Sequence, residues 1–177
     1  HTSDITFDLS KNKIEIHKQN SDNWKVTLID TGEKTMTGGR LKRIKKYIKE
    51  RFLLTYGDGV SDINLKELMK FHISHGKLAT LTAVQPPGRW GSLNINTNKV
   101  ESFQEKPKGD GSWINGGFFI LEPEVINLIE SDECIWEQSP LMNLASQNQL
   151  MSFKHNGFWK AMDTLRDKKY LEELWNS

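Results

Sequence analysis

Cysteine is nearly absent from this sequence, with Cys134 alone among 177 residues. One cysteine excludes an internal disulfide framework and a zinc site built from cysteines, and it fits a reducing cytoplasm, where we expect the protein to reside. No apolar run approaches the roughly 18 residues that a membrane-spanning helix needs. The sequence also has no excess of one charge sign, because it contains 24 Lys and Arg and 23 Asp and Glu. We therefore expect neither a nucleic acid nor a membrane as partner.

Hydrophobic residues make up 36% of the chain, with 6 Trp and 8 Phe, which is enough for a sizeable core and predicts one domain. Alternation of apolar and polar residues predicts a hairpin over 5–9 and 13–17 and a third strand over 24–30. The apolar runs 52–56 and 78–84 are typical of strands buried on both faces. A helical pattern separates them, so we expect parallel neighbours with a right-handed crossover.

Local patterns also predict the helices and strands in the rest of the chain. We expect a helix opened by Thr37, a second helix ending at Gly76, three β segments, two helices around 123–130 and 137–147, a strand at 151–155 and a last helix. No internal repeat or low-complexity linker interrupts them. The fold class predicted is α/β, with a mixed, mainly parallel Rossmann-like sheet flanked by helices, in a single domain over residues 1–177.

Asp58 stands between Gly57 and Gly59, directly after the apolar run 52–56. Ligands of open α/β sheets bind beyond the carboxyl ends of strands, and Mg²⁺ takes one or two carboxylates and completes its shell with phosphate oxygens and water. Glycines on both sides let a nucleotide approach the backbone. Asp-Gly is also a common turn pair, and for this stretch alone a simple turn is the better interpretation.

The loop 30–40 is rich in hydroxyls and glycine and runs into a helix start, which suits a phosphate or the polar edge of a base. Arg40 adds a permanently charged, forked donor, and Thr35 a hydroxyl. The alternative is an N-cap at Thr37 followed by a solvated basic helix. We accept that alternative for the lysines of this helix but not for Thr35 and Arg40.

Three further stretches carry candidates, each with a plainer alternative. Glu105 and Lys106 suit sugar hydroxyls and a sugar phosphate, although an exposed ion pair would look the same. Asn115 and Gly116 belong to "INGGFF", where paired glycines in a strand indicate close approach of another group or a β-bulge. Asp163 lies just before the last helix and is either an N-cap or a second carboxylate on the metal of Asp58.

Six stretches together resemble one family. In chain order they are "TMTGGRLKR", "TYGDG", "PPGRWGSL", "FQEKPKGDG", "INGGFF" and "MDTLRD". This order is similar to that of the sugar-phosphate nucleotidyltransferases, in particular to their cytidylyl branch, which acts on glucose 1-phosphate. The resemblance runs nearly from end to end. It implies that the phosphate of glucose 1-phosphate attacks the α-phosphorus of CTP, forming CDP-glucose and releasing pyrophosphate, in the service of dideoxysugar and O-antigen (lipopolysaccharide) synthesis.

The resemblance also implies roles for individual residues. Asp58 and Asp163 would hold Mg²⁺, Thr35 and Arg40 would contact the cytidine end, and Gly57 would lie close to the nucleotide. The glucose 1-phosphate side would consist of four residues: Glu105, Lys106, Asn115 and Gly116. Catalysis would then rest on alignment and charge neutralisation. The family also implies that the full-length form is a homo-oligomer.

The sequence departs from the family in one respect. The family's N-terminal glycine-rich loop and the Lys-Pro motif that accompanies it there, which together wrap the triphosphate, do not occur in these 177 residues; the pair Lys106-Pro107 belongs to the stretch "FQEKPKGDG". We therefore expect the chain to correspond to the later two-thirds of the enzyme without its first βαβ units, to show little activity alone, and to expose a sheet edge. The alternatives are a non-catalytic remnant or subunit of the same fold, another sugar-1-phosphate nucleotidyltransferase, or a glycosyltransferase that uses "DGVSD" as its acid pair.

Overall fold

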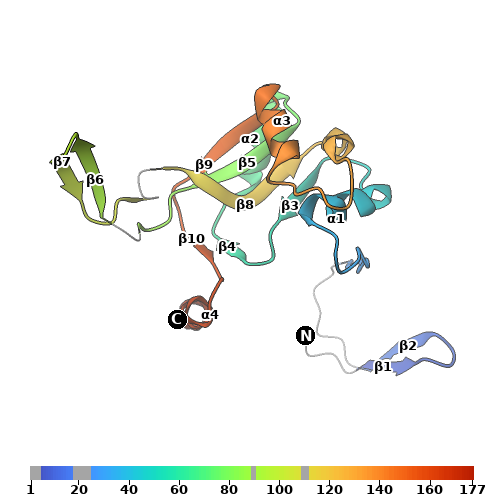
Figure 1. Ribbon diagram of the computed structural model, residues 1–177. Helices are drawn as coiled ribbons and strands as arrows, with labels where there is room; N and C mark the ends of the chain where they lie inside the picture. The colour runs from blue at the N-terminus through green and yellow to red at the C-terminus, as the bar shows by residue number, and fades with distance from the viewer. Residues whose placement is uncertain (1–4, 18–24, 89–90, 109–111) are drawn as a thin grey trace. The chain divides into compact units, whose positions relative to one another are not determined.

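A computed structural model describes residues 5–17, 25–88, 91–108 and 112–177, and the chain divides into two compact units, His1–Asp30 and Thr31–Ser177 (Figure 1). Parts of three sequence patterns lie outside the described residues, namely Trp24, Arg89-Trp90 and Gly109-Asp110-Gly111. In the part of the chain that is described, no helix combines the length and apolar content that crossing a bilayer requires.

The first unit contains the expected hairpin. Strands β1 (Ile5–Asp8) and β2 (Lys13–Ile16) pair antiparallel, and the Asp8 carboxylate accepts from the amides of Ser10 and Lys11 in the connecting turn. The strand expected over 24–30 is wrong for its described part, since residues 25–30 form no regular element. Alternation predicts a half-buried face, but Val26 and Leu28 are 70% and 92% exposed, so the apolar positions have no core to face.

The second unit is built on a four-stranded mixed sheet in the order β3-β8-β5-β9. Its strands are β3 (Phe52–Thr55), β5 (Ala79–Val84), β8 (Ile114–Leu121) and β9 (Leu150–His155). The mixed α/β class is thereby confirmed. Two of the three pairings are antiparallel and one, between β5 and β9, is parallel, so among the described residues the parallel share is smaller than expected.

The expected parallel pairing of the runs 52–56 and 78–84 is wrong. Strand β8 lies between β3 and β5 and is antiparallel to both. It arrives some thirty residues after β5, so the local strand–helix–strand spacing carries no sign of it. As a result β3 is an edge strand whose residues alternate between half-buried and exposed, instead of being buried on both faces.

Helices begin and end close to their sequence signals. Asn64 caps α2 (Leu65–His75) by accepting from the amides of Lys66 and Glu67, and Gly76 ends it with φ of +63°. A short helix α1 (Thr37–Arg43) continues into a 3₁₀ turn, and the segment expected as a helix around 123–130 is a 3₁₀ helix instead. The other elements are η1 (Lys45–Tyr47), η3 (Pro123–Leu128), α3 (Ser139–Ser146) and α4 (Leu165–Trp175).

Besides Leu68 of α2, Val84 and Ile120, which are also buried, the hydrophobic core is a cluster of residues from the sheet and from the segments of α1, η3 and α3 (Figure 1). Its buried apolar residues are Leu41, Ala79, Phe119, Leu121, Val125, Ile126, Ile129, Trp136, Leu141 and Leu144. The first two of the three expected β segments are strands β6 (Ser92–Asn96) and β7 (Lys99–Gln104), which pair as a two-stranded sheet of their own instead of joining the mixed sheet. A second small sheet, β4 (Gly59–Ser61) with β10 (Trp159–Ala161), was not expected, because three residues give too short a pattern.

Candidate active site

The two carboxylates expected to share a metal are carried by neighbouring segments. Asp58 directly precedes β4, and Asp163 follows β10 by two residues. Because β4 and β10 are antiparallel with Gly59 opposite Ala161, the start of one strand lies beside the end of the other. The ladder extends one step further, since the main-chain N–H of Met162 donates to the carbonyl oxygen of Asp58 at 2.8 Å.

Both carboxylates are exposed to solvent. In the described ranges no group of three or more His, Cys, Asp or Glu side chains is placed to hold a metal ion. A pair of carboxylates still fits Mg²⁺, which takes one or two protein carboxylates and fills its other positions with phosphate oxygens and water. The donor set is therefore suited to a metal that arrives with a phosphorylated substrate.

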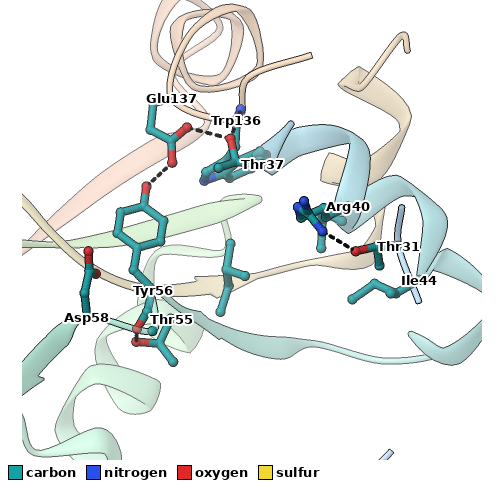
Figure 2. A pocket seen from close by; sticks show the side chains of 12 residues that line it. Thr31, Thr37, Arg40, Ile44, Thr55, Tyr56, Asp58, Trp136 and Glu137 are labelled. Carbon is teal, nitrogen blue, oxygen red and sulfur yellow. Dashed lines mark hydrogen bonds between the residues drawn. The ribbon is translucent and has the colours of Figure 1, made fainter. Parts of the chain in front are cut away.

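Asp58 opens onto a pocket of about 680 Å³ between the end of β3 and helix α1 (Figure 2). Gly57 and Arg40 also line it, so three of the predicted residues meet there. An alanine Cβ at Gly57 would have no atom within 4 Å, which shows open space at the backbone. The apolar residues that line it are Leu41, Ile44, Leu54 and Trp136.

Arg40 is held in place by its own loop. Its guanidinium donates to the hydroxyl of Thr31 at 2.7 Å and to the carbonyl of Glu33 at 3.1 Å. Thr35, in contrast, is only 7% exposed and does not line the pocket. Its amide donates to the Gly32 carbonyl, so the visible contact of Thr35 shapes the loop, and its contact with a nucleotide stays a prediction.

Glycines 38 and 39 let α1 approach the segment that precedes α3. A Cβ at Gly38 would lie 2.6 Å from the carbonyl oxygen of Cys134, and one at Gly39 would overlap the backbone of Asp132. The amide of Gly39 donates to the Cys134 carbonyl at 3.2 Å. This close contact brings Glu137, which sequence reasoning missed, to the rim of the pocket.

Glu137 accepts hydrogen bonds from the hydroxyls of Tyr56 and Thr37 (Figure 2). Thr37 is therefore not the N-cap that the alternative reading of the loop expected; the N-cap position is Met36. Burial raises the pKa of Tyr56, and the hydrogen bond to Glu137 raises it further, so the phenol is a stable donor. No spacing rule could have found Glu137, since its partners lie 81 and 100 residues away.

Asn115 and Gly116 have roles inside the fold. The Asn115 amide donates to the Tyr56 hydroxyl at 3.2 Å and accepts from the Gly117 N–H at 2.9 Å. A Cβ at Gly116 would lie 2.9 Å from Val84 Cγ1, so the packing of β8 on β5 requires glycine there. The pairing of these strands also shifts register between Leu81 and Ala83, which is the irregularity that the plainer reading expected.

Glu105 and Lys106 form an ion pair at 3.7 Å, with side chains 62% and 63% exposed. They follow β7 and do not line the pocket. Their surroundings match the exposed pair of the plainer reading, and their contact with a sugar phosphate stays a prediction.

A mixed sheet with flanking helices places this chain in the α/β class. The family model described as "Nucleotidyl transferase" matches residues 5–167, and the chain belongs to this family. Nucleotidyltransferases of this family generally use a divalent metal ion.

Two relatives give the resemblance its detail. The chain is 59% identical over 177 residues to the glucose-1-phosphate cytidylyltransferase of Salmonella typhimurium, covering 99% of this chain and 69% of that protein. It is 38% identical over 174 residues to a probable glucose-1-phosphate cytidylyltransferase of Bacillus subtilis, covering 97% of this chain and 68% of the relative. The predicted resemblance to the cytidylyl branch is thereby confirmed.

Solved structures share the fold. HddC from Yersinia pseudotuberculosis superposes with a TM-score of 0.65 at 24% identity, covering 88% of this chain and 69% of that one. A UDP-glucose pyrophosphorylase complexed with UDP-glucose gives a TM-score of 0.58 at 12% identity, with coverage of 82% and 64%.

Proposed function

We propose that this protein acts on CTP and glucose 1-phosphate, forming CDP-glucose and pyrophosphate with Mg²⁺ as its cation. One observation supports this beyond the likeness to its relatives. The β4–β10 ladder brings the segments of Asp58 and Asp163 together, and Asp58 lines a pocket that Arg40 also lines. Two carboxylates and a guanidinium are groups that suit a triphosphate bound as its metal complex.

The reaction needs no covalent intermediate with the protein. A phosphate oxygen of glucose 1-phosphate forms the new bond to the α-phosphorus of CTP, and the bond to the bridging oxygen breaks, with pyrophosphate keeping the electron pair. Mg²⁺ held by Asp58 and Asp163 would supply charge neutralisation at the phosphates. Arg40 would neutralise and orient the nucleotide, and open backbone at Gly57 would let it approach closely. Positioning and electrostatics thus carry the rate.

The sugar side rests on the family resemblance. We propose Glu105, Lys106, Asn115 and Gly116 for it. The Asn115 amide has one hydrogen and one lone pair beyond its bonds to Tyr56 and Gly117, so it could still serve a sugar hydroxyl. Thr35 is proposed for the cytidine end on the same basis. Use of the product in surface-polysaccharide synthesis, a cytoplasmic location and a homo-oligomeric state stay predictions as well.

The test is release of pyrophosphate from CTP and glucose 1-phosphate by the full protein, with UTP as competing nucleotide and EDTA removing the metal. We expect transfer that depends on Mg²⁺, and a loss of at least about a hundredfold in Asp58→Asn with unchanged circular dichroism. Asp62→Asn is the matched control four residues along the same segment.

A folded full protein that binds sugar phosphate but releases no pyrophosphate would contradict this function. That result would instead favour the non-catalytic subunit, and transfer with a different nucleotide would favour another sugar-1-phosphate nucleotidyltransferase.

A further inference from the structure

Glu137 occupies an unusual place at the pocket. It stands between η3 and α3, yet each of its carboxylate oxygens accepts a hydroxyl from a different distant element. Oε1 accepts from Tyr56, 81 residues earlier, and Oε2 accepts from Thr37 at 2.8 Å, 100 residues earlier. The carboxylate therefore joins three segments that are remote in sequence (Figure 2).

The direction of each bond in this bridge is fixed. A carboxylate only accepts, and each hydroxyl has a single hydrogen. The Tyr56 hydroxyl oxygen accepts a hydrogen bond from the Asn115 side-chain amide at 3.2 Å, and the Thr37 hydroxyl oxygen accepts one from the main-chain N–H of Trp136 at 2.9 Å. Each hydroxyl is thus an acceptor on one side and must give its hydrogen to Glu137. Only one arrangement satisfies all four bonds, so the bridge favours one geometry.

The two ends of the bridge are next to the two charged groups of the proposed site. Tyr56 is followed directly by Gly57 and Asp58. Thr37 opens α1, one helical turn before Arg40. The bridge therefore ties the segment after β3, which contains Asp58, to the helix that carries Arg40, and both of these residues line one pocket.

We propose that Glu137 is a positioning residue, which sets the separation of Asp58 and Arg40 across the pocket by holding Tyr56 and Thr37 at once. This inference rests on the proposed function. A nucleotide that binds its metal at Asp58 and its counter-charge at Arg40 needs both at a fixed separation, and small misplacements of such groups are costly for catalysis.

The contact of α1 with the segment before α3 does not depend on Glu137. The same surfaces are joined by the ion pair of Arg43 with Asp132, and by the amide of Met36, which donates to the Asp132 carbonyl at 2.9 Å. Glu137 adds one further link, its hydrogen bond from the Tyr56 hydroxyl, and this bond connects the helix contact to the turn that contains Asp58. Asp132→Ala is therefore a matched control, because it weakens the same helix contact and leaves the tie to Tyr56 intact.

The experiment compares Glu137→Ala, Glu137→Gln, Tyr56→Phe and Asp132→Ala in the full protein. We expect Glu137→Ala and Tyr56→Phe to raise the Mg²⁺ concentration for half-maximal transfer, and to lower kcat, by about ten- to a hundredfold. Their double variant should be no worse than Glu137→Ala alone, because both changes break one tie. Glu137→Gln keeps one acceptor oxygen and should fall between. Asp132→Ala should lower Tm and leave both kinetic constants unchanged.

A second measurement needs no substrate. Amide hydrogen exchange over residues 56–62 and at Met162 should quicken in Glu137→Ala and Tyr56→Phe, and not in Asp132→Ala. If the parent protein transfers nothing but this exchange responds as expected, the proposed function fails and the tie stands. If the parent is active, and Glu137→Ala and Tyr56→Phe differ from Asp132→Ala in neither exchange nor Mg²⁺ dependence, the positioning role is overturned. Tyr56→Phe decides the matter even if Glu137→Ala does not fold.

Discussion

Met162 and Asp58 are joined by a main-chain hydrogen bond of 2.8 Å, from the N–H of the first to the carbonyl of the second. This bond lengthens the β4–β10 ladder by one step and brings the backbone of Asp163 beside the Gly57-Asp58 turn. A backbone contact holds the segments whatever the state of the side chains. Sheet pairing therefore holds the backbones of Asp58 and Asp163 near each other, and both residues are exposed to solvent.

The first prediction is that Asp58 and Asp163 act as one unit. Asp58→Asn and Asp163→Asn should each depress pyrophosphate release by at least about a hundredfold, and the double variant should be scarcely worse than the more damaged single one, because both remove the same ion. Initial rates at several Mg²⁺ concentrations measure this. If the loss of rate in the double variant equalled the product of the two single losses, the two acids would serve different steps.

The second prediction separates two glycines that look alike in sequence. Gly57→Ala should leave the free energy of unfolding unchanged, since its Cβ would have no atom within 4 Å, and should weaken nucleotide binding. Gly116→Ala should destabilise the protein by about 1–3 kcal/mol, because its Cβ would lie 2.9 Å from Val84 Cγ1 and 3.0 Å from the Thr82 carbonyl oxygen. Urea unfolding and nucleotide titration are the two measurements. An unfolding penalty at Gly57 would remove the argument for a ligand there.

These two glycines show what the sequence can and cannot predict. Glycine in the "INGGFF" strand pattern correctly indicated close approach, but only the structure shows that Val84 and the Thr82 backbone make it. Most strands and helices follow from local patterns and were predictable, but the N-caps of α1 and α4 are Met36 and Thr164 instead of Thr37 and Asp163. The place of β8 between β3 and β5 depends on pairing over long sequence separations, and no local period encodes that choice.

The candidate site likewise contains residues that local sequence predicts and one that it does not. Asp58 and Arg40 stand out because glycine and charge mark their motifs locally. Glu137 stands in "WEQSP", which has no such mark, and its partners are 81 and 100 residues distant. Its contribution arises only when α1 packs on the segment before α3, which the small residues Gly38 and Gly39 permit.

A third prediction concerns two histidines of α2. Lys77 N–H donates to His75 Nδ1 at 2.9 Å, so the proton of His75 sits on Nε2 and is donated to the Thr80 hydroxyl at 2.7 Å. Thr80 then donates to His72 Nδ1 at 2.8 Å, which leaves His72 Nε2–H to donate to Glu122 at 3.2 Å. This chain of bonds requires both imidazoles to be neutral.

Burial lowers the pKa of both His72 and His75 below 6.5 in the folded protein. The charge of Arg51 acts in the same direction on His72, and those of His72 and Lys77 on His75, while Glu122 opposes the shift at His72. The unfolded chain then binds more protons, so the stabilisation is complete above pH 6.5 and is lost as the pH falls below it. Urea unfolding between about pH 7.5 and 5 should show this decline. Replacing both His72 and His75 by glutamine should reduce the dependence of the unfolding free energy on pH, and His17→Gln should not. An unaltered pH dependence in the double variant would contradict the proposed chain of hydrogen bonds.

The last prediction concerns the N-cap of α4, Thr164, which directly follows Asp163. Thr164 and Asp167 form a reciprocal capping box, and Lys160 contacts the Asp167 carboxylate at 2.6 Å. The hydrogen bond from Lys160, followed by that from Thr164, lowers the pKa of Asp167 to about 2. Because the folded pKa is lowered, the stabilisation is present above pH 3.8 and is lost as the pH falls towards about 2.

Thr164→Ala should therefore cost about 1 kcal/mol of stability near neutral pH. Asp167→Asn should be less stable than the parent protein near neutral pH. The stabilities of the two proteins should become equal in acid, where Asp167 is protonated. Both variants should also raise the Mg²⁺ requirement of transfer, since the box fixes the backbone that leads from Met162 through Asp163 into the helix. Arg166→Ala is the control within the same turn of α4. Circular dichroism against pH and Mg²⁺ titration of the rate measure the two effects. If stability falls while the Mg²⁺ requirement does not move, Asp163 is held by the ladder to Asp58 alone.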